Sequence, residues 1–359
     1  MSNDFNFQIL EPKCGLGLKE QLEELEILLF HLLCQEMVTA EQLLQTRIYL
    51  TDAANQLRFV EDSNLYKEYL SKGAISYIQQ PLLSGAKVAL QVCFTKRDDI
   101  IKSGSSECLQ VQMGGITLLF HSVRFAVEDV RNMDSEKQTM LAFRKHMECL
   151  APLGMTLEEN CHRTWIYVRD IDRHYAGVVN GRNKVFEKEG LTAETHYIAS
   201  TGIGGYCDNR VAAVAVDFLS VQGIGREDIQ YLHALDYLNP THEYGVAFER
   251  GTKLTLPNCA VSFISGTASI DKNGEVLHCG DVMTQAGRLF LNIEKLLNDG
   301  GQGLLDVQFF LVYLRDIADY HNINRYLHLR FPHTPFLIFE APVCRPEWLI
   351  EVECIAMQG

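Results

Sequence analysis

Trp165-Ile166-Tyr167-Val168-Arg169-Asp170 is one of three related segments in this chain of 359 residues. Residues 47–52 and 311–316 share its pattern, in which a tyrosine between apolar residues is followed three positions later by an aspartate. Such a run predicts a strand that ends in a turn. Three copies predict an internal repeat, and the unequal intervals between them exclude a regular solenoid.

The elements around each copy recur in the same order. An amphipathic helix is expected before the tyrosine strand, at 18–34, 136–150 and 282–297. After the strand we expect a second helix, at 65–72, 175–188 and 320–330, and then a closing strand, at 88–94, 211–218 and 349–356. The last two repeats also open with strands, within 108–125 and 254–270, the latter turning at Asp271-Lys272-Asn273-Gly274.

The sequence therefore predicts an α+β protein built from repeated ββαβαβ units. The expected domains are residues 1–100, 101–225 and 226–359. The first unit is expected to be truncated, because its apolar helix begins by Leu18 and leaves no room for an opening hairpin. The three tyrosines are interpreted as packing residues, since they recur whatever other side chains their unit carries.

Composition excludes several classes of partner. Hydrophobic residues make up 47% of the chain, enough for sizeable cores, and the formal net charge is -14. Such a charge repels phosphate backbones and anionic lipid, so neither nucleic acid nor a membrane is expected as a partner. Met1–Asn6 does not resemble a signal peptide and no apolar run reaches membrane-spanning length, which predicts a cytoplasmic protein.

Cysteine and histidine spacing predicts neither disulfides nor a metal. The 11 cysteines are scattered without a CxxC pair, and an odd number argues against a closed disulfide framework. His162, His174, His242 and His321 lack the spacing of a ligand set such as HExxH. We therefore expect reduced thiols, no metal and no cofactor.

The closing strand of the third repeat, residues 349–356, alternates acids with apolar residues. A period of two places Glu351 and Glu353 on one face of this strand. The stretches expected to correspond, 89–91 and approximately 213–215, carry no acid. Because acids needed only for solvation would recur in every copy, the difference favours a single site at Glu351. In the alternative interpretation, the other two faces are simply buried against neighbouring elements.

The third repeat, from about residue 252 to 358, resembles the Rid (YjgF-like) family. The matching stretches are VSFISGTASI at 261–270, GDVMTQA at 280–286, NI at 292–293, VYLRD at 312–316 and IEVE at 350–353. Rid proteins are trimers with clefts between subunits, so the resemblance implies a pseudo-trimer within one monomeric chain. It also implies an acid/base role for Glu351 and places Gly266 at the substrate. The carboxylate-binding arginine of imine-hydrolysing Rid proteins is absent from 334–339, which puts simple iminoacid deamination in doubt.

Over its full length the chain resembles the chorismatases, which pair an N-terminal region with a Rid-like C-terminal domain. The resemblance rests on overall length, RTWIYVRD at 163–170, STGIGG at 200–205, YGVAFERG at 244–251 and the ending 344–356. It implies hydrolysis of the enol ether of chorismate, a small dicarboxylate, to pyruvate and either a dihydrodiol or 3-hydroxybenzoate. The stretch at 200–205 is interpreted as a turn that permits close backbone approach, of a ligand or of the protein itself.

This chemistry needs a protonated acid and guanidinium groups for two carboxylates. Burial of Glu351 in an apolar strand would raise its pKa, which suits a general acid. Arg163 and Arg250 are the expected carboxylate ligands, with surface ion pairs as the alternative, and Tyr244 is expected to add a hydroxyl. Cys344 is expected at the substrate, because in chorismatases a residue at this place influences the product, and cysteine favours the dihydrodiol.

Two other functions remain open from the sequence. One is a Rid-type hydrolase of imines or enamines, which would need another arginine in place of the missing one. The other is a protein that binds a small molecule without catalysis. Fold similarity alone does not choose among the three functions.

Overall fold

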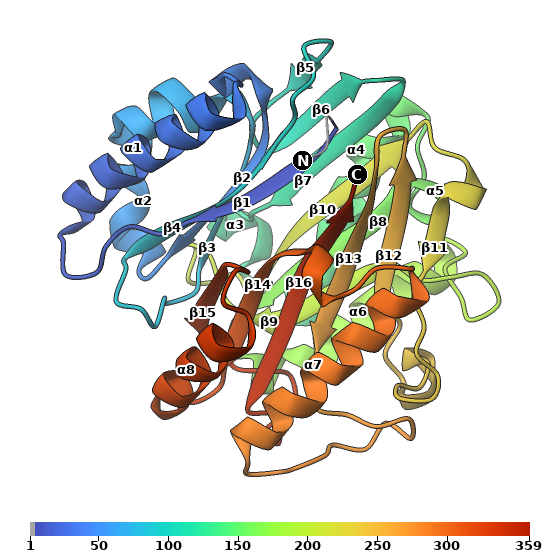
Figure 1. The fold of residues 1–359 in the computed structure, drawn as a ribbon. Helices are drawn as coiled ribbons and strands as arrows, with labels where there is room; N and C mark the ends of the chain where they lie inside the picture. The colour runs from blue at the N-terminus through green and yellow to red at the C-terminus, as the bar shows by residue number, and fades with distance from the viewer. Residues whose placement is uncertain (1–3) are drawn as a thin grey trace.

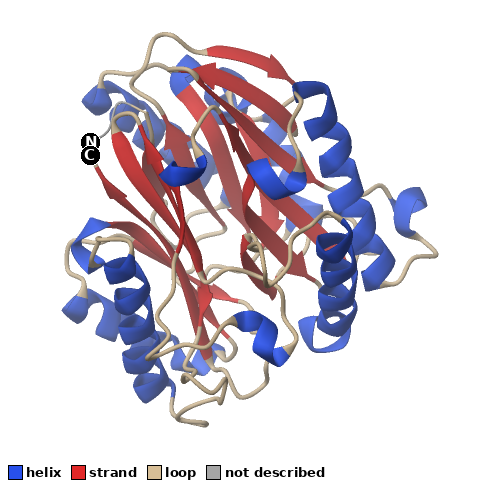
Figure 2. Cartoon of the chain, turned by 90° about the vertical axis from the view of Figure 1, so that its right-hand side faces the viewer, coloured by secondary structure: helices blue, strands red, loops and turns tan. Residues whose placement is uncertain are grey.

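The computed structural model describes residues 4–359, apart from the side chain of Tyr244. Its strands form three mixed sheets (Figure 1). Figure 2 shows the strands in the middle of the molecule and the long helices on its outside. The predicted α+β architecture of repeated Rid-like units is confirmed.

The first sheet has the order β1-β4-β2-β3 and carries two α-helices. Its elements are β1 (Asn6–Leu10), α1 (Leu18–Glu36), β2 (Leu43–Leu50), α2 (Ala53–Asp62), β3 (Ala74–Gln79) and β4 (Val88–Phe94). It has four strands where each of the other sheets has six, so the first unit is truncated as predicted. Its second helix, α2, begins earlier than expected, and the predicted segment 65–72 forms a π-helical and a 3-10 turn instead.

The second sheet has the order β5-β6-β7-β10-β8-β9. Its strands are β5 (Ile101–Gly104), β6 (Cys108–Met113), β7 (Ile116–Val123), β8 (Cys161–Val168), β9 (Ala199–Gly204) and β10 (Val214–Gln222). Its α-helices are α3 (Val127–Val130), α4 (Ser135–Leu150), α5 (Leu157–Asn160) and α6 (Ile171–Lys188). The segment 200–205 is therefore mostly strand β9, and its interpretation as a turn was wrong.

The third sheet, β11-β12-β13-β16-β14-β15, repeats the order of the second. Its strands are β11 (Ile229–Tyr231), β12 (Gly251–Leu256), β13 (Cys259–Thr267), β14 (Val307–Leu314), β15 (Phe336–Glu340) and β16 (Ile350–Gln358). Its helices are α7 (Val282–Asp299) and α8 (Tyr320–Arg330). The hairpin turn lies between β12 and β13, whereas Asp271–Gly274 forms a separate turn closed by the bridge between Ile270 and Val276.

Each sheet contains two strands that the predicted order omits, namely its first strand (β1, β5 or β11) and a strand that follows the second helix. β3, β9 and β15 follow the second helix of their units and pair in parallel with the tyrosine strands β2, β8 and β14. They have five or six residues each, and the two glycines of β9 weaken its strand pattern. The tyrosine strands and the helices that precede them lie close to their predicted bounds.

The helices follow from amphipathic patterning. In α7 the side chains of Leu289, Ile293 and Leu296 are buried at helical spacing, and Asp281 caps the first turn by accepting from the Thr284 amide. Among the helices of residues 4–359, none combines the length and apolar character needed to cross a bilayer.

Isolated backbone bridges connect the three sheets pairwise. Gln79 pairs with Tyr206 between the first and second sheets, Ala199 with Glu249 between the second and third, and Leu82 with Phe339 between the third and first. The tyrosines of the three repeated segments, Tyr49, Tyr167 and Tyr313, are fully buried in one shared core. The repeated motif therefore supplies the common centre against which the sheets pack.

Candidate active site

A cavity of about 360 Å³ lies between the second and third sheets. The second sheet contributes β9 and the face of α6, and the third contributes the end of β13 and the segments before β12 and β16. A cleft of this size is large enough for a small organic ligand. Of the predicted site residues, Glu351, Arg250, Gly266 and Cys344 line this cavity.

Glu351 lies on β16, opposite Tyr313 of β14, with only 4% of its surface exposed. Burial and the negative charge of Glu353 raise the pKa of Glu351 to about 8, against the opposing charges of Arg163 and Arg250. No residue in the described part of the chain donates a hydrogen bond to this carboxyl group. Glu351 therefore presents a largely neutral carboxylic acid to the cavity near pH 7.

Gly266 makes room for this acid. A Cβ atom at Gly266 would lie 2.8 Å from the carboxyl carbon of Glu351, so any larger residue would displace the acid. The glycine sits in a β-bulge, because the pairing of β13 with β16 shifts between Ile264 and Thr267. Its amide donates to the Thr201 hydroxyl of β9 at 2.9 Å, which ties the bulge to the second sheet.

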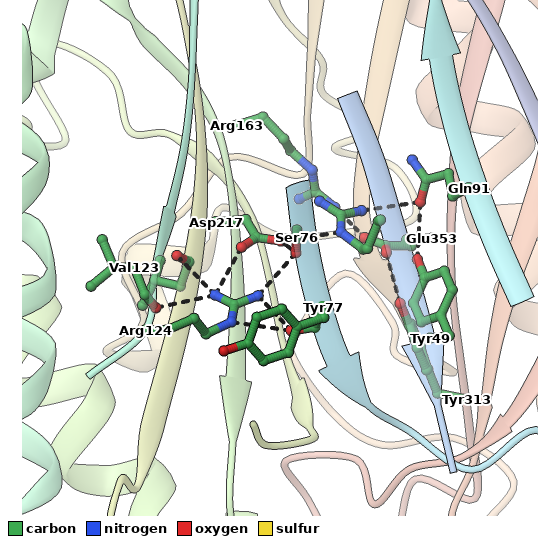
Figure 3. Close-up of polar contacts among 12 residues, drawn as sticks. Tyr49, Ser76, Tyr77, Gln91, Val123, Arg124, Arg163, Asp217, Tyr313 and Glu353 are labelled. Atoms are coloured by element: carbon green, nitrogen blue, oxygen red, sulfur yellow. Dashed lines mark hydrogen bonds and ion pairs between the residues drawn. The ribbon is translucent and has the colours of Figure 1, made fainter. Parts of the chain in front are cut away.

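Glu353, two residues further along the same face, lies in a buried ion pair with Arg163. Its oxygens accept hydrogen bonds from Arg163, Thr201 and Tyr313, the last at 2.7 Å (Figure 3). Its partners come from the second and third sheets, so this buried cluster joins the two units that form the cavity. Two neighbouring carboxyl groups thus have different environments, one ion-paired and one protonated, which is typical of acid catalysis.

Arg163 does not line the cavity. Its guanidinium group pairs with Glu353 and lies 4.7 Å from the centre of the Trp165 ring. The structure places Arg163 in the buried cluster beside Glu351, where its charge lowers the pKa of that acid. The side chain of Tyr244, which was predicted to bind substrate, lies outside the described residues.

Three arginines line the cavity: Arg250, Arg182 and Arg345. Arg182 of α6 and Arg250 are both buried, and their guanidinium carbons lie 5.7 and 5.5 Å from the Phe248 ring. Arg345 lies 4.7 Å from the Trp348 ring and donates to the carbonyl oxygen of Gly274. The cavity walls therefore carry positive charge in two places: two arginines beside Phe248 and one arginine beside Trp348.

The sequence reasoning missed Arg182 and Arg345. Arg182 follows Val178 by four residues, so helical spacing places it on the buried face of α6, where an arginine is unusual and signals a site. Arg345 adjoins Cys344, which was predicted to lie at the substrate.

Cys344 faces Tyr175 of α6. The tyrosine hydroxyl donates to the cysteine sulfur, and burial together with the charge of Glu351 raises the pKa of the Cys344 thiol to about 12. The thiol is therefore protonated at neutral pH and is part of a neutral polar wall. Gly202 of β9 packs against the same ring, since a Cβ atom there would lie 3.0 Å from Tyr175.

Comparison with known proteins places the third repeat in a known family. Residues 256–358 match the family described as Endoribonuclease L-PSP. The 3-aminoacrylate deaminase RutC of Acinetobacter baylyi is 32% identical over 98 residues, which is 27% of this chain and 78% of that protein. The chain belongs to the Rid (Endoribonuclease L-PSP) family. The region matched contains β13, α7, β14 and β16, and thus Glu351.

The whole chain of this Rid-family protein shares the fold of a chorismatase. A crystal structure of that enzyme superposes with a TM-score of 0.71, covering 99% of both chains at 17% sequence identity. This likeness extends over the first and second sheets, which the Endoribonuclease L-PSP match does not reach. The predicted chorismatase architecture is therefore confirmed as a fold.

Proposed function

We propose that this Rid-family protein hydrolyses the enolpyruvyl ether of chorismate, giving pyruvate and a dihydroxycyclohexadiene carboxylate. The observation that carries the proposal is Glu351, a buried acid with a pKa of about 8 that faces a cavity lined by three arginines. The shared fold with a chorismatase supports the same reaction class.

Glu351 acts as the general acid. Its proton moves to the terminal methylene carbon of the enolpyruvyl group, the carbon–carbon double bond supplies the electron pair, and an oxocarbenium ion forms at the ether carbon. Water adds to that carbon and gives up one proton to the Glu351 carboxylate. The hemiketal then collapses: its hydroxyl oxygen becomes the carbonyl of pyruvate, the bond between its central carbon and the ring oxygen breaks, and the ring oxygen takes up the hydroxyl proton. Protonation of this kind contributes roughly 10²- to 10⁴-fold to a rate.

The charges around the acid suit each stage of this reaction. The carboxylate of Glu353 raises the pKa of Glu351 and so keeps the proton available. The same negative charge stabilises the oxocarbenium ion that follows proton transfer. Burial excludes bulk water from the acid, which strengthens both effects.

The arginines account for a dicarboxylate substrate. We assign one substrate carboxylate to Arg182 and Arg250 beside Phe248, and the other to Arg345 beside Trp348. Guanidinium groups bind carboxylates through two parallel hydrogen bonds, so they orient the substrate as well as attract it. They also overcome the repulsion of a chain with a net charge of -14.

The test is incubation of purified protein with chorismate, with pyruvate measured by a coupled dehydrogenase and the ring product by its absorbance and mass. Wild type is expected to release pyruvate, and Glu351→Gln to lose about 10²- to 10⁴-fold in kcat. Glu340→Gln, on an exposed position of the same sheet, is the matched control and should retain full activity. Absence of pyruvate from folded wild type would overturn the proposal.

The product identity tests the assignment of Cys344. We expect the dihydroxycyclohexadiene carboxylate from wild type, because Cys344 and Tyr175 form a neutral wall beside Glu351. Formation of 3-hydroxybenzoate as the main product would contradict this part of the proposal while leaving ether cleavage intact.

A second candidate is hydrolysis of imines or enamines. It is favoured by the 32% identity with a 3-aminoacrylate deaminase over the region that carries Glu351. Arg250 or Arg182 would then replace the arginine that is absent from 334–339. Release of ammonia from 3-aminoacrylate, without pyruvate from chorismate, would identify this function. Binding of chorismate without turnover of either compound would indicate a non-catalytic binding protein.

We further propose that the units 1–100, 101–225 and 226–359 form a pseudo-trimer within a monomeric chain. The three bridges that connect the sheets pairwise support this arrangement. Light scattering during size-exclusion chromatography is expected to give the mass of one chain. A trimer of chains would contradict the proposal.

A further inference from the structure

Two cysteines and a histidine meet on the second sheet, outside the Glu351 cavity. Cys108 begins β6, His121 lies directly across from it on β7, and Cys149 lies in the last turn of α4. One ligand atom from each of the three lies within 4.8 Å of the other two. The Cys149 sulfur is 3.9 Å from Nε2 of His121. In a tetrahedral zinc site, ligand sulfur and nitrogen atoms are roughly 3.5–3.8 Å apart.

A chain of hydrogen bonds determines which nitrogen of His121 faces the thiols. We assign the donor role to Nε2 of His146 in its contact with the Ser220 hydroxyl oxygen, which lies 3.0 Å away. Nδ1 of His146 is then unprotonated and accepts from Nδ1 of His121 at 3.2 Å. Consequently, Nε2 of His121 keeps its lone pair and directs it toward Cys149.

The contacts around His121 are those expected around a metal-ligating histidine. A ligating histidine donates its second ring N–H to a neighbour that holds the ring in place, and His146 provides that contact. His146 is itself held by stacking on Phe218, with ring centres 4.1 Å apart.

The two cysteines are less deeply buried than the histidine. Cys108 and Cys149 are half-buried, whereas His121 is 8% exposed. A cation can therefore reach the thiols while the histidine is fixed from behind. Two thiolates and a neutral imidazole match the ligands that zinc and other thiophilic divalent ions prefer.

We infer that Cys108, His121 and Cys149 bind one thiophilic divalent cation, such as Zn²⁺, with the fourth position open to water or an added ligand. Binding releases two protons, one from each thiol, and the resulting centre of one dication and two thiolates is neutral. Three protein ligands and an open position are the arrangement of catalytic zinc sites. The sequence expectation of no metal missed this set, because 13 residues separate Cys108 from His121 and 28 separate His121 from Cys149.

The test is titration of the reduced, chelator-treated full-length protein with Co²⁺, followed by displacement with Zn²⁺. We expect one Co²⁺ per chain and a thiolate-to-cobalt charge-transfer band that Zn²⁺ removes. Cys149→Ser and Cys108→Ser should each strongly reduce the band and weaken Zn²⁺ binding roughly tenfold or more. Cys34→Ser, at an exposed cysteine on α1, is the control and should behave like wild type.

His146→Phe tests the hydrogen-bond chain, since the phenyl ring preserves the stacking on Phe218 but cannot accept from His121. It should weaken Zn²⁺ about 10- to 100-fold without abolishing the charge-transfer band.

A band that survives in both cysteine variants would overturn the proposal by placing the metal elsewhere. Absence of binding to the folded, reduced protein at micromolar Co²⁺ and Zn²⁺ would do the same. In that case, a disulfide between Cys108 and Cys149 in air-oxidised protein, found by peptide mass, would identify a redox-active thiol pair instead.

Discussion

The cleft between the second and third sheets differs from its counterpart between the first and second sheets at three matched positions. Strand register relates the two clefts, because Tyr313 pairs with Glu351 where Tyr167 pairs with Ala215. The cavity positions are Glu351, Gly202 and Ala268, and their counterparts are Ala215, Tyr77 and Arg124. Small residues therefore leave space beside the acid in one cleft, and large residues occupy that space in the other.

Arg124 shows how the other cleft is filled. Its guanidinium group donates to the Ser76 hydroxyl and the Tyr77 carbonyl oxygen, and its ion pair with Asp217 spans 2.9 Å (Figure 3). Asp217 and Glu353 hold equivalent places, and each is paired with buried arginine. The buried ion pairs are thus common to both clefts, whereas the uncharged acid and the cavity belong to one.

The largest expected effect is on stability. Asp217→Asn removes the counter-charge of Arg47 and Arg124, which are both buried, and should lower the free energy of unfolding by about 3–5 kcal/mol. Activity per folded molecule should stay unchanged, because Asp217 pairs with Arg47 and Arg124 in the other cleft. Urea unfolding followed by circular dichroism checks the first point. A loss of activity in fully folded Asp217→Asn would show that the two clefts are coupled.

Gly202→Tyr would introduce a tyrosine into the open cleft at the position that Tyr77 occupies in the filled cleft. The new ring would compete with Tyr175 and fill the cavity, so kcat/KM for chorismate should fall at least about 100-fold, or roughly 2.7 kcal/mol. Gly287→Tyr is the matched control, because nothing lies within 4 Å of its Cβ position on α7. Unchanged kcat/KM in Gly202→Tyr would mean that the substrate binds elsewhere.

The sequence predicts local elements better than it predicts register. The helices before the tyrosine strands are strongly amphipathic, so periodicity locates them close to their observed bounds. In the closing strand of the second repeat, the run VAAVAVDF at 211–218 is apolar almost throughout and gives no signal for its alignment. The expected match of 213–215 with Glu351–Glu353 was wrong by two residues, and the acid Asp217 was therefore overlooked.

The candidate site was only partly predictable for a related reason. Glu351, Gly266 and Cys344 lie close in sequence to recognisable stretches of the third repeat, and the structure brings them together at the cavity. The pairing of Arg163 with Glu353 joins residues 190 positions apart, so no local pattern reveals that this arginine faces the buried carboxylate. Arg182 of α6 was missed because its place at the cavity depends on how the second unit packs against the third.

The pH dependence of activity separates the two buried acids. Since Glu351 has to be protonated, kcat/KM for wild type should fall as the pH rises through about 8. Glu353→Gln removes a negative charge that raises this pKa, so the fall should move to lower pH. Asp217→Asn should leave the profile in place. The pH profile of kcat/KM is measured on the folded fraction of each variant. Equal shifts in Glu353→Gln and Asp217→Asn would contradict the assignment of this pKa to Glu351.

The smallest effect is expected from giving the filled cleft its own acid. In Ala215→Glu the new carboxyl group would share a sheet face with Asp217 and meet the guanidinium of Arg124, which favours the charged form. A charged carboxylate cannot donate the proton that the reaction needs, and Tyr77 and Arg124 leave no space for substrate beside it. Ala215→Glu should therefore change pyruvate release less than about twofold, and it should not rescue Glu351→Gln, since a factor of two is only roughly 0.4 kcal/mol. Rescue of the double variant would show that an acid on this face suffices, and that the open cavity is not what distinguishes the two clefts.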